Sequence, residues 1–248
     1  MDRMNDYDAA TYGNRIADVY DTWEALCSAE TEQTLAFLAA LAGAGPVLEL
    51  GIGTGRVAVP LAQRGLAVAG IDASAAMVAR LRAKPGGEAI PVTMGSFAET
   101  WPAGPFRLIY VVFNTFFGLL TQEEQVRCFA EVGGHLTADG VFVLEAFVPD
   151  PTRFTHGQAT HTSYIDSRHV RLDASRHDPL GQRVTTQHVV IGEEGIRLYP
   201  VQIRYAWPSE LDLMARLAAL RLRERWSSWH REPFTSASTR HISVYEPG

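Results

Sequence analysis

The chain has 248 residues, of which 46% are hydrophobic and 20% charged, and its formal net charge is −6. This length and apolar content are typical of one globular domain with a sizeable core and room for an insertion. The acidic balance argues against nucleic acid as a partner, because proteins that follow phosphate backbones carry a basic surplus. No apolar run reaches the roughly 20 residues that cross a bilayer, so we expect no membrane association.

Two further features bear on the compartment. Residues 1–13 contain acidic side chains and no apolar stretch, unlike a signal peptide. Cys27 and Cys128 have neither the spacing of a metal site nor that of a redox pair. We interpret both as free thiols of a protein in the reducing cytoplasm.

Strand and helix signals alternate from the amino terminus to about residue 148. Helical spacing of apolar residues predicts one or two helices over 14–42. Apolar runs bounded by turn residues then predict strands at 47–50, 67–71, 90–94, 107–113 and 140–147. Between them the sequence predicts helices at 54–64, from after Asp72 through Arg82, and at 122–131. This alternation predicts an α/β fold with a Rossmann-like, mostly parallel sheet and helices on both faces.

After Pro149 the pattern changes. Residues 161–206 alternate between apolar and polar and are divided by turn signals, which predicts an antiparallel β insertion after the fifth strand. A helix at 209–220 and strands at 222–226 and 241–245 then complete a seven-stranded sheet. His169 and His177 share the parity of Arg171 and Asp173. We interpret this as a solvent-facing strand face and expect no metal site.

The stretch from Val47 to Gly65, VLELGIGTGRVAVPLAQRG, runs from an apolar strand through a glycine-rich turn into a helix. A dinucleotide-binding turn needs G-x-G-x-x-G, but Arg56 stands where the third glycine belongs. The carboxylate of Glu49 would repel a pyrophosphate and attract a cation. S-adenosylmethionine carries a sulfonium and an ammonium and no phosphate, so these residues favour it. Asp72 can accept hydrogen bonds from the ribose of either ligand and does not discriminate between them.

Four motifs follow one another along the chain. The first is E-x-G-x-G-x-G, formed by Glu49, Gly51, Gly53 and Gly55; the others are IDASAAM at 71–77, GSFAE at 95–99 and VVFNTFFGL at 111–119. In this order they resemble the motifs of the class I S-adenosylmethionine-dependent methyltransferases, and the resemblance covers nearly the whole chain. It implies that S-adenosyl-L-methionine is the methyl donor and that no metal is needed.

The resemblance also implies which residues surround the cofactor. From the last three motifs these are Asp72 on the ribose, Ala73 and Met77 on the adenine side, Ser96 and Phe97, and Phe113 and Asn114 beside the methionine part. Ser96 departs from the family pattern, which often has an acid there to bind the adenine amine. That contact is expected to be weaker, or to come from the backbone beside Phe97.

Within the class, the layout is similar to small-molecule enzymes such as glycine N-methyltransferase and the amino-sugar N,N-dimethyltransferases. The shared marks are ADVYD at 17–21 and the antiparallel insertion. The similarity implies a lid in which Tyr20, with Tyr12 and Arg15 as weaker candidates, lies against the cofactor. The implied division is a helical lid at 1–45, a cofactor-binding core at 46–148, an insertion over the acceptor site at 149–206 and the rest of the core at 207–248.

By this resemblance we expect N-methylation of a small-molecule acceptor in secondary metabolism. O-methylation and a non-methylating protein that binds S-adenosylmethionine remain as alternatives, with a nicotinamide oxidoreductase as a third reading. The candidate catalytic residues are Tyr20, Glu145 and His161. The sequence leaves open the identity of the acceptor and whether the protein is a homodimer.

Overall fold

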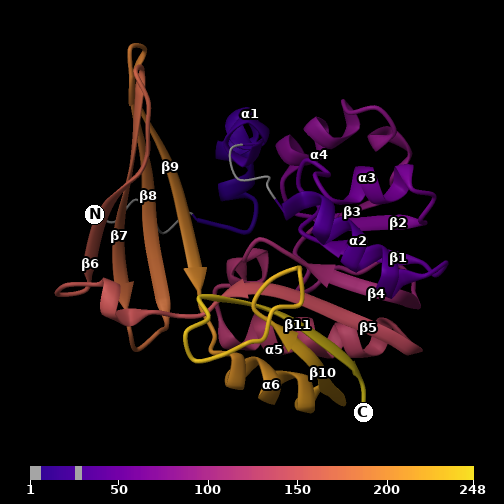
Figure 1. Ribbon diagram of the computed structural model, residues 1–248. Helices are drawn as coiled ribbons and strands as arrows, with labels where there is room; N and C mark the ends of the chain where they lie inside the picture. The colour runs from indigo at the N-terminus through magenta and orange to yellow at the C-terminus, as the bar shows by residue number, and fades with distance from the viewer. Residues whose placement is uncertain (1–6, 26–29) are drawn as a thin grey trace.

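The computed structural model of the protein describes residues 7–25 and 30–248 (Figure 1). Cys27, one of the two predicted free thiols, lies outside the described residues. The helices are α1 (Thr11–Ala25), α2 (Thr31–Ala42), α3 (Ala58–Gln63), α4 (Ala75–Arg82), α5 (Gln122–His135) and α6 (Pro208–Leu217). Short 3-10 turns occur at η2 (Gly87–Ala89), η3 (Thr115–Gly118) and η4 (Pro151–Arg153).

The larger sheet has seven strands in the order β10-β11-β5-β4-β1-β2-β3. Their bounds are β1 (Val47–Leu50), β2 (Val68–Asp72), β3 (Val92–Met94), β4 (Phe106–Val111), β5 (Leu136–Phe147), β10 (Leu220–Trp226) and β11 (Arg240–Pro247). β1 to β5 are parallel, whereas β11 runs antiparallel to both β5 and β10. The predicted α/β fold with a mostly parallel seven-stranded sheet is confirmed.

Helices cover both faces of this sheet (Figure 1). α2 and α3 bury Leu38 and Leu61 against one face, and α5 and α6 bury Phe129 and Met214 against the other. Every residue of β1 is buried, as expected of a central parallel strand with helices on both sides. None of the described helices is long and apolar enough to span a bilayer.

The smaller sheet is antiparallel and has the order β6-β7-β8-β9. Its strands are β6 (Gln158–Ile165), β7 (His169–Asp178), β8 (Arg183–Gly192) and β9 (Gly195–Arg204). Figure 1 shows this sheet standing beside the larger one, with α1 between it and α4. The predicted insertion after the fifth strand is confirmed.

The prediction that the strand face carrying Arg171 and Asp173 is exposed to solvent is wrong. Cross-strand pairing aligns Asp173 with His188, and His188 with Tyr199. The ring of Trp23 on α1 packs against both His188 and Tyr199, with centroids 6.2 and 5.0 Å apart. The face that carries Asp173 therefore turns toward α1. The alternation of polar and apolar residues in the sequence indicates that the strand has two different faces. It does not indicate which of the two faces is covered by another element.

Two helix starts also differ from the prediction. The helix after the glycine turn begins at Ala58 rather than at residue 54, because the turn continues to Val57. α6 begins with Pro208. Proline suits the first helical position, where the backbone N–H has no partner inside the helix.

Candidate active site

A cavity of about 360 Å³ opens at the carboxyl ends of β1, β2 and β4, where α1 and β9 close over it. This is the end of a parallel sheet at which ligands bind in open α/β folds, and the volume suits a small-molecule site. The structure brings eleven of the predicted site residues to its wall: Tyr12, Tyr20, Gly51, Gly53, Asp72, Ala73, Met77, Ser96, Phe97, Phe113 and Asn114.

The glycine turn forms the floor of the cavity. Gly51 and Gly53 have φ angles of +72° and +56°, in the left-handed region that favours glycine. A Cβ atom on Gly51 would lie 2.3 Å from the Cγ2 atom of Thr115, so a side chain does not fit there. Gly51 and Gly53 both line the cavity, so their backbone can be approached closely by a cofactor.

Asp72 links the glycine turn to α4. Its Oδ2 atom accepts a hydrogen bond from the Gly53 N–H at 2.7 Å, and its Oδ1 atom accepts one from the Ser74 N–H at 2.7 Å. Burial raises the pKa of the Asp72 carboxyl, and these two bonds oppose that rise. Ser74 is the N-cap of α4 and accepts from the Met77 N–H at 3.2 Å. The ribose and adenine candidates thus form one hydrogen-bonded unit.

Phe113 and Asn114 form a turn after β4 in which both residues have positive φ angles, 56° and 63°. Such angles are uncommon outside glycine and persist where the surroundings enforce them. The Phe113 N–H donates to Oε2 of Glu145 at 3.0 Å, and Oδ1 of Asn114 accepts from the Phe147 N–H at 2.7 Å. These bonds hold both side chains at the cavity wall.

Glu145 does not line the cavity, in contrast to its predicted catalytic role. Its side chain is buried, and its Oε1 atom accepts from the Trp229 indole at 3.2 Å. Burial raises the pKa of this carboxyl. Glu145 lies on β5, next to β4, and holds the Phe113 turn through the hydrogen bond to the Phe113 N–H. It therefore positions residues at the site without lining the cavity itself.

Glu49 also lies beneath the site rather than on its wall. Its Oε2 atom accepts from the Tyr110 hydroxyl at 2.8 Å, and burial raises the pKa of the Glu49 carboxyl to about 8. Burial therefore favours the protonated form of this carboxyl. Glu49 does not reach the cavity wall, and its predicted interaction with a cationic ligand stays a prediction.

Gly55 and Arg15 do not line the cavity either. A Cβ atom on Gly55 would lie 2.9 Å from Val59 and 3.0 Å from Leu81, so this glycine allows α3 and α4 to pack closely. Arg15 is exposed on α1.

His161 stands on β6, away from the cavity wall. Its side chain is 53% exposed, and its Nε2 atom lies 3.4 Å from Oδ2 of Asp173. The other oxygen of Asp173 pairs with His188 at 2.6 Å. His161 is thus the outer member of a polar row on the inserted sheet, away from the cavity where its predicted catalytic role would place it. Across the described residues, no group of three His, Cys, Asp or Glu side chains could hold a metal ion.

Helix α1 ties the cofactor motifs to the inserted sheet. Oδ1 of Asn14 accepts from the Ser74 hydroxyl at 2.7 Å, and Oδ1 of Asp21 accepts from the Thr54 hydroxyl at 2.6 Å. Asp21 also pairs with Lys84 at 2.9 Å. Tyr12 and Tyr20 line the cavity between these contacts. The described part of α1 thus lies over the site, and its action as a lid stays a prediction.

The sequence predicted that the inserted sheet covers the acceptor site but did not identify the residues that form the remaining wall of the cavity. Tyr7 and Leu119 line it together with Phe147, Val201 and Ile203. The Gln202 N–H donates to the Tyr7 hydroxyl at 3.2 Å, which joins the amino-terminal segment to β9. Alternation of Val201 and Ile203 in the sequence indicates a shared strand face, but nothing local in the sequence shows that this face meets the site.

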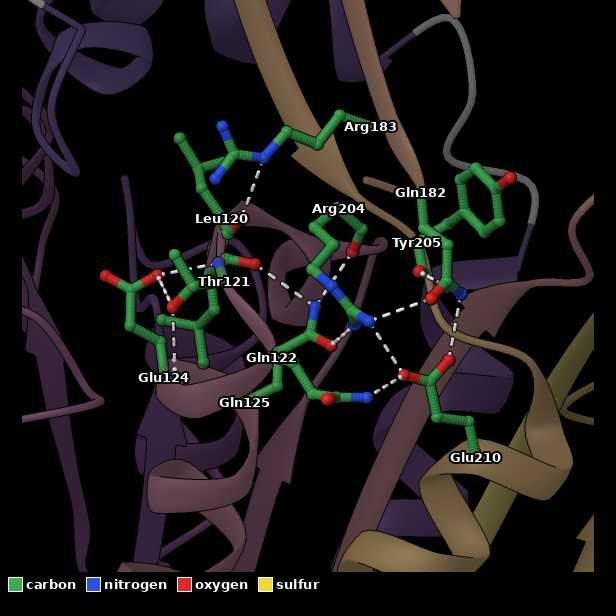
Figure 2. A network of polar contacts seen from close by, with 11 residues as sticks. Leu120, Thr121, Gln122, Glu124, Gln125, Gln182, Arg183, Arg204, Tyr205 and Glu210 are labelled. Atoms are coloured by element: carbon green, nitrogen blue, oxygen red, sulfur yellow. Dashed lines mark hydrogen bonds and ion pairs between the residues drawn. The ribbon is translucent and has the colours of Figure 1, made fainter. Parts of the chain in front are cut away.

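A polar network holds this wall in place, as Figure 2 shows. The buried Arg204 guanidinium donates to Oε1 of Gln125 at 2.5 Å and pairs with Glu210 at 2.8 Å. Nε2 of Gln125 donates to the backbone carbonyls of Arg204 and Leu119 at 2.8 and 3.1 Å. The Arg183 Nε atom donates to the Leu120 carbonyl at 3.1 Å. The end of β9 and the loop before α5 are therefore bound to one another.

A second cavity, of about 380 Å³, lies on the other side of α1 near the tips of β7 to β9. Trp23, Arg171 and Tyr199 line it, and none of the four motifs reaches it. The guanidinium of Arg171 stacks over the Trp23 ring at 4.7 Å from the centroid. We assign the ligand site to the first cavity because the motifs converge there.

Comparisons with known proteins agree with this assignment. A family model described as a methyltransferase domain matches residues 47–140. The CcbJ methyltransferase of Streptomyces caelestis is 40% identical, with 98% of this chain and 100% of that chain covered and a TM-score of 0.91. A cypemycin N-terminal methyltransferase from Streptomyces sp. is 28% identical over 201 residues, covering 81% of this chain and 82% of that protein.

The fold is shared more widely. A structure of CalS10 with bound S-adenosylmethionine, an amino pentose methyltransferase from Micromonospora echinaspora, is 20% identical and has a TM-score of 0.68, covering 91% of this chain and 96% of that chain. The motifs, the cavity and these matches agree that the chain belongs to the class I S-adenosylmethionine-dependent methyltransferases.

Proposed function

We propose that the enzyme methylates a nitrogen atom of a small-molecule acceptor in secondary metabolism. The observation that carries the proposal is the convergence of the glycine turn, Asp72 and the Phe113 turn on one cavity whose opposite wall belongs to the inserted sheet. The relative named as an N-terminal methyltransferase supports nitrogen as the target. The buried, unpaired Cys128 is compatible with the cytoplasm as the compartment.

The residues present fit the cofactor. The glycine turn leaves its backbone open, and Asp72 offers a carboxylate for ribose hydroxyls beside Met77 and Phe97. When bound there, S-adenosylmethionine supplies a methyl group activated by the sulfonium. The chain then has to orient the acceptor, keep out water and hold the reacting atoms in line. Tyr20 and Tyr12 on α1 and the β9 wall perform these tasks in the proposal.

Nitrogen is favoured over oxygen by the side chains of the cavity. A hydroxyl acceptor needs a base to remove its proton, whereas a neutral amine does not. Among the described lining residues, the carboxylates are Asp8 and Asp72 and there is no histidine or lysine. Asp72 is held by two backbone N–H groups, and Asp8 accepts hydrogen bonds from the start of α1.

Calorimetric titration tests the cofactor part of the proposal. We expect micromolar binding of S-adenosylmethionine and S-adenosylhomocysteine and no heat of binding with NAD. Release of S-adenosylhomocysteine on addition of amine acceptors, followed by mass spectrometry, tests the reaction. Tight NAD binding would contradict the assignment, and so would cofactor binding without turnover of any acceptor.

Substitution of Asp72 tests the ribose contact. Asp72→Ala removes the carboxylate and is expected to weaken cofactor affinity by about 1–3 kcal/mol, the scale of a hydrogen bond to a charged group. Calorimetry with S-adenosylhomocysteine measures the change, and circular dichroism checks the fold. Unchanged affinity in a folded Asp72→Ala protein would place the ribose elsewhere.

A further inference from the structure

The acceptor half of the cavity is apolar. Once the glycine turn and the residues around Asp72 are assigned to the cofactor, the remaining wall comes from the loop before α5, the end of β5, and β9. Its side chains include Leu119, Phe147, Val201 and Ile203. Apart from the carboxylate of Asp8 next to Tyr7, the polar groups here are neutral, chiefly the hydroxyls of Tyr7 and Tyr20.

This half of the cavity offers no positive charge. Of the described residues that line the cavity, none is a lysine, arginine or histidine. The nearby Arg204 is bound by Gln125 and Glu210 within the network of Figure 2. Arg56 stacks over the Phe113 ring, 3.3 Å from its centroid, rather than lining the cavity.

The charges that do line the cavity are negative. Asp8 is exposed at the start of α1, and a hydrogen bond from the Thr11 hydroxyl lowers the pKa of its carboxyl. The whole chain carries a formal charge of −6, which repels anions from any entrance. Burying a phosphate or a carboxylate of the acceptor in this half of the cavity, which has no cationic side chain among the described lining residues, would leave it without a partner, which is costly.

We propose that the acceptor is an amine carried on an uncharged, largely apolar body, and that it reacts as the free base. The proposal rests on the proposed N-methyl transfer and specifies its substrate class. It excludes phosphorylated and nucleotide-linked amines and free amino acids, whose anionic groups have no cation to bind among the described lining residues.

The transfer step accounts for the proton. The nitrogen lone pair forms the N–C bond while the C–S bond breaks, and the electron pair of that bond stays on sulfur. The product is an ammonium ion, which loses its proton to solvent after release. Burial raises the pKa of Tyr7, which makes its hydroxyl a poor base at neutral pH. In the proposal the amine therefore loses its proton to solvent before it reacts.

Matched pairs of amines test the substrate class. One pair is an amino acid amide and the corresponding free amino acid. The other pair is the methyl glycoside of an amino sugar and the 1-phosphate of the same amino sugar. We expect the uncharged member of each pair to give at least about a tenfold higher kcat/KM, since the other member buries an unpaired anion. Calorimetric titration of each amine into the protein with S-adenosylhomocysteine should give the same order of affinity.

A charge placed in the wall gives a second readout. Val201→Lys should bring the two members of a pair to within about threefold of each other, because the new ammonium can pair with the anionic group. Leu198→Lys is the control: it adds the same charge to the same strand at a side chain that is 54% exposed and does not line the cavity. This control should keep the original preference.

The pH profile completes the test. With no base from the enzyme, kcat/KM should rise about tenfold per pH unit below the acceptor's own pKa and level off above it. The break should move when an acceptor of different pKa is used. Equal or better use of the anionic members would overturn the inference while leaving N-methylation intact. Turnover of hydroxyl acceptors with no amine accepted would overturn both.

Discussion

Asp72 shows how a single carboxylate can prepare a site for a ligand. Its two oxygens bind backbone N–H groups on both sides, in the glycine turn and at the start of α4. Each carboxylate oxygen still has a lone pair for a ribose hydroxyl, because one oxygen accepts two hydrogen bonds. The same side chain therefore fixes the shape of the turn and offers the ribose contact. The sequence suggested only the second of these roles.

Gly53 can be tested against another glycine with a positive φ angle. Gly53 and Gly65 have φ angles of +56° and +88°, and a Cβ atom on either would have no neighbour closer than 3.9 Å. Each alanine substitution should cost about 1–2 kcal/mol of folding stability through the left-handed backbone. Gly53→Ala alone should weaken S-adenosylhomocysteine binding, because its methyl group adds bulk to the cavity floor. Urea unfolding and calorimetry measure the two effects.

An equal loss of affinity in Gly65→Ala, which lies outside the cavity, would show that backbone strain rather than contact with the ligand is responsible. Normal binding by Gly53→Ala would mean that the turn is not the cofactor site.

Glu49 gives the protein a pH-dependent stability. Its pKa is about 8 in the folded state and 4.5 for an ordinary carboxyl, so the folded state holds a proton that the unfolded state releases between these values. The stabilisation is complete below pH 4.5 and is lost as the pH rises through 8. The loss should amount to a few kcal/mol, on the order given by the shift in pKa.

Glu49→Gln should remove this dependence, because the amide does not ionise and its oxygen can still accept from Tyr110. The measurement is the free energy of unfolding in urea at several values between pH 5 and pH 8. The parent protein should lose stability relative to the variant across this range. Parallel curves would show that the Glu49 carboxyl is ionised in the folded protein.

Among the elements, β9 and the loop before α5 depend on each other for their placement. Both line the acceptor half of the cavity, and Gln125 on α5 binds a carbonyl of each. The capping box of α5 anchors the same loop, since the Thr121 hydroxyl accepts from the Glu124 N–H and the Glu124 carboxylate accepts from the Thr121 N–H. The wall is thus set by helix ends and a buried network rather than by the glycine turn.

Gln125→Met keeps the length of the side chain but removes its hydrogen bonds. We expect the acceptor KM to rise by about fivefold or more with cofactor affinity unchanged, since the loss affects only the acceptor wall. Arg225→Met is the control, because it breaks a largely buried polar contact, the 2.6 Å ion pair with Asp212, away from the cavity. The control should lower stability without changing the acceptor KM. Equal KM values in both variants would limit the network to a role in folding.

At the scale of the whole molecule, the sequence predicted the core more completely than the site. Continuous apolar runs such as β1 identify buried parallel strands, and motif glycines mark the end of the sheet where ligands bind. The sequence did not show that Glu145 and His161 lie off the cavity wall, because their distance from the cavity depends on sheet order and cross-strand register. Tyr7 and Val201 are 194 residues apart and meet at the cavity through long-range packing.

The two parts of the molecule are joined over the cavity by α1. This helix binds the core through Asn14 and Asp21 and the inserted sheet through Trp23. Closure of such a lid aligns the acceptor with the methyl group and excludes water. Its loss should therefore reduce turnover more than cofactor affinity, because the glycine turn and Asp72 bind the cofactor from the core side.

Tyr20 is the α1 side chain with which we test this coupling. Tyr20→Phe keeps the ring and removes the hydroxyl, and we expect it to retain much of the activity. Tyr20→Ala opens the cavity wall and should lose most of kcat while the affinity for S-adenosylhomocysteine changes less. Val19→Ala is the matched control, because Val19 precedes Tyr20 on α1 but lines the second cavity. Steady-state kinetics and calorimetry separate the outcomes: a Tyr20→Ala protein as active as the parent would show that α1 covers the site without taking part in transfer.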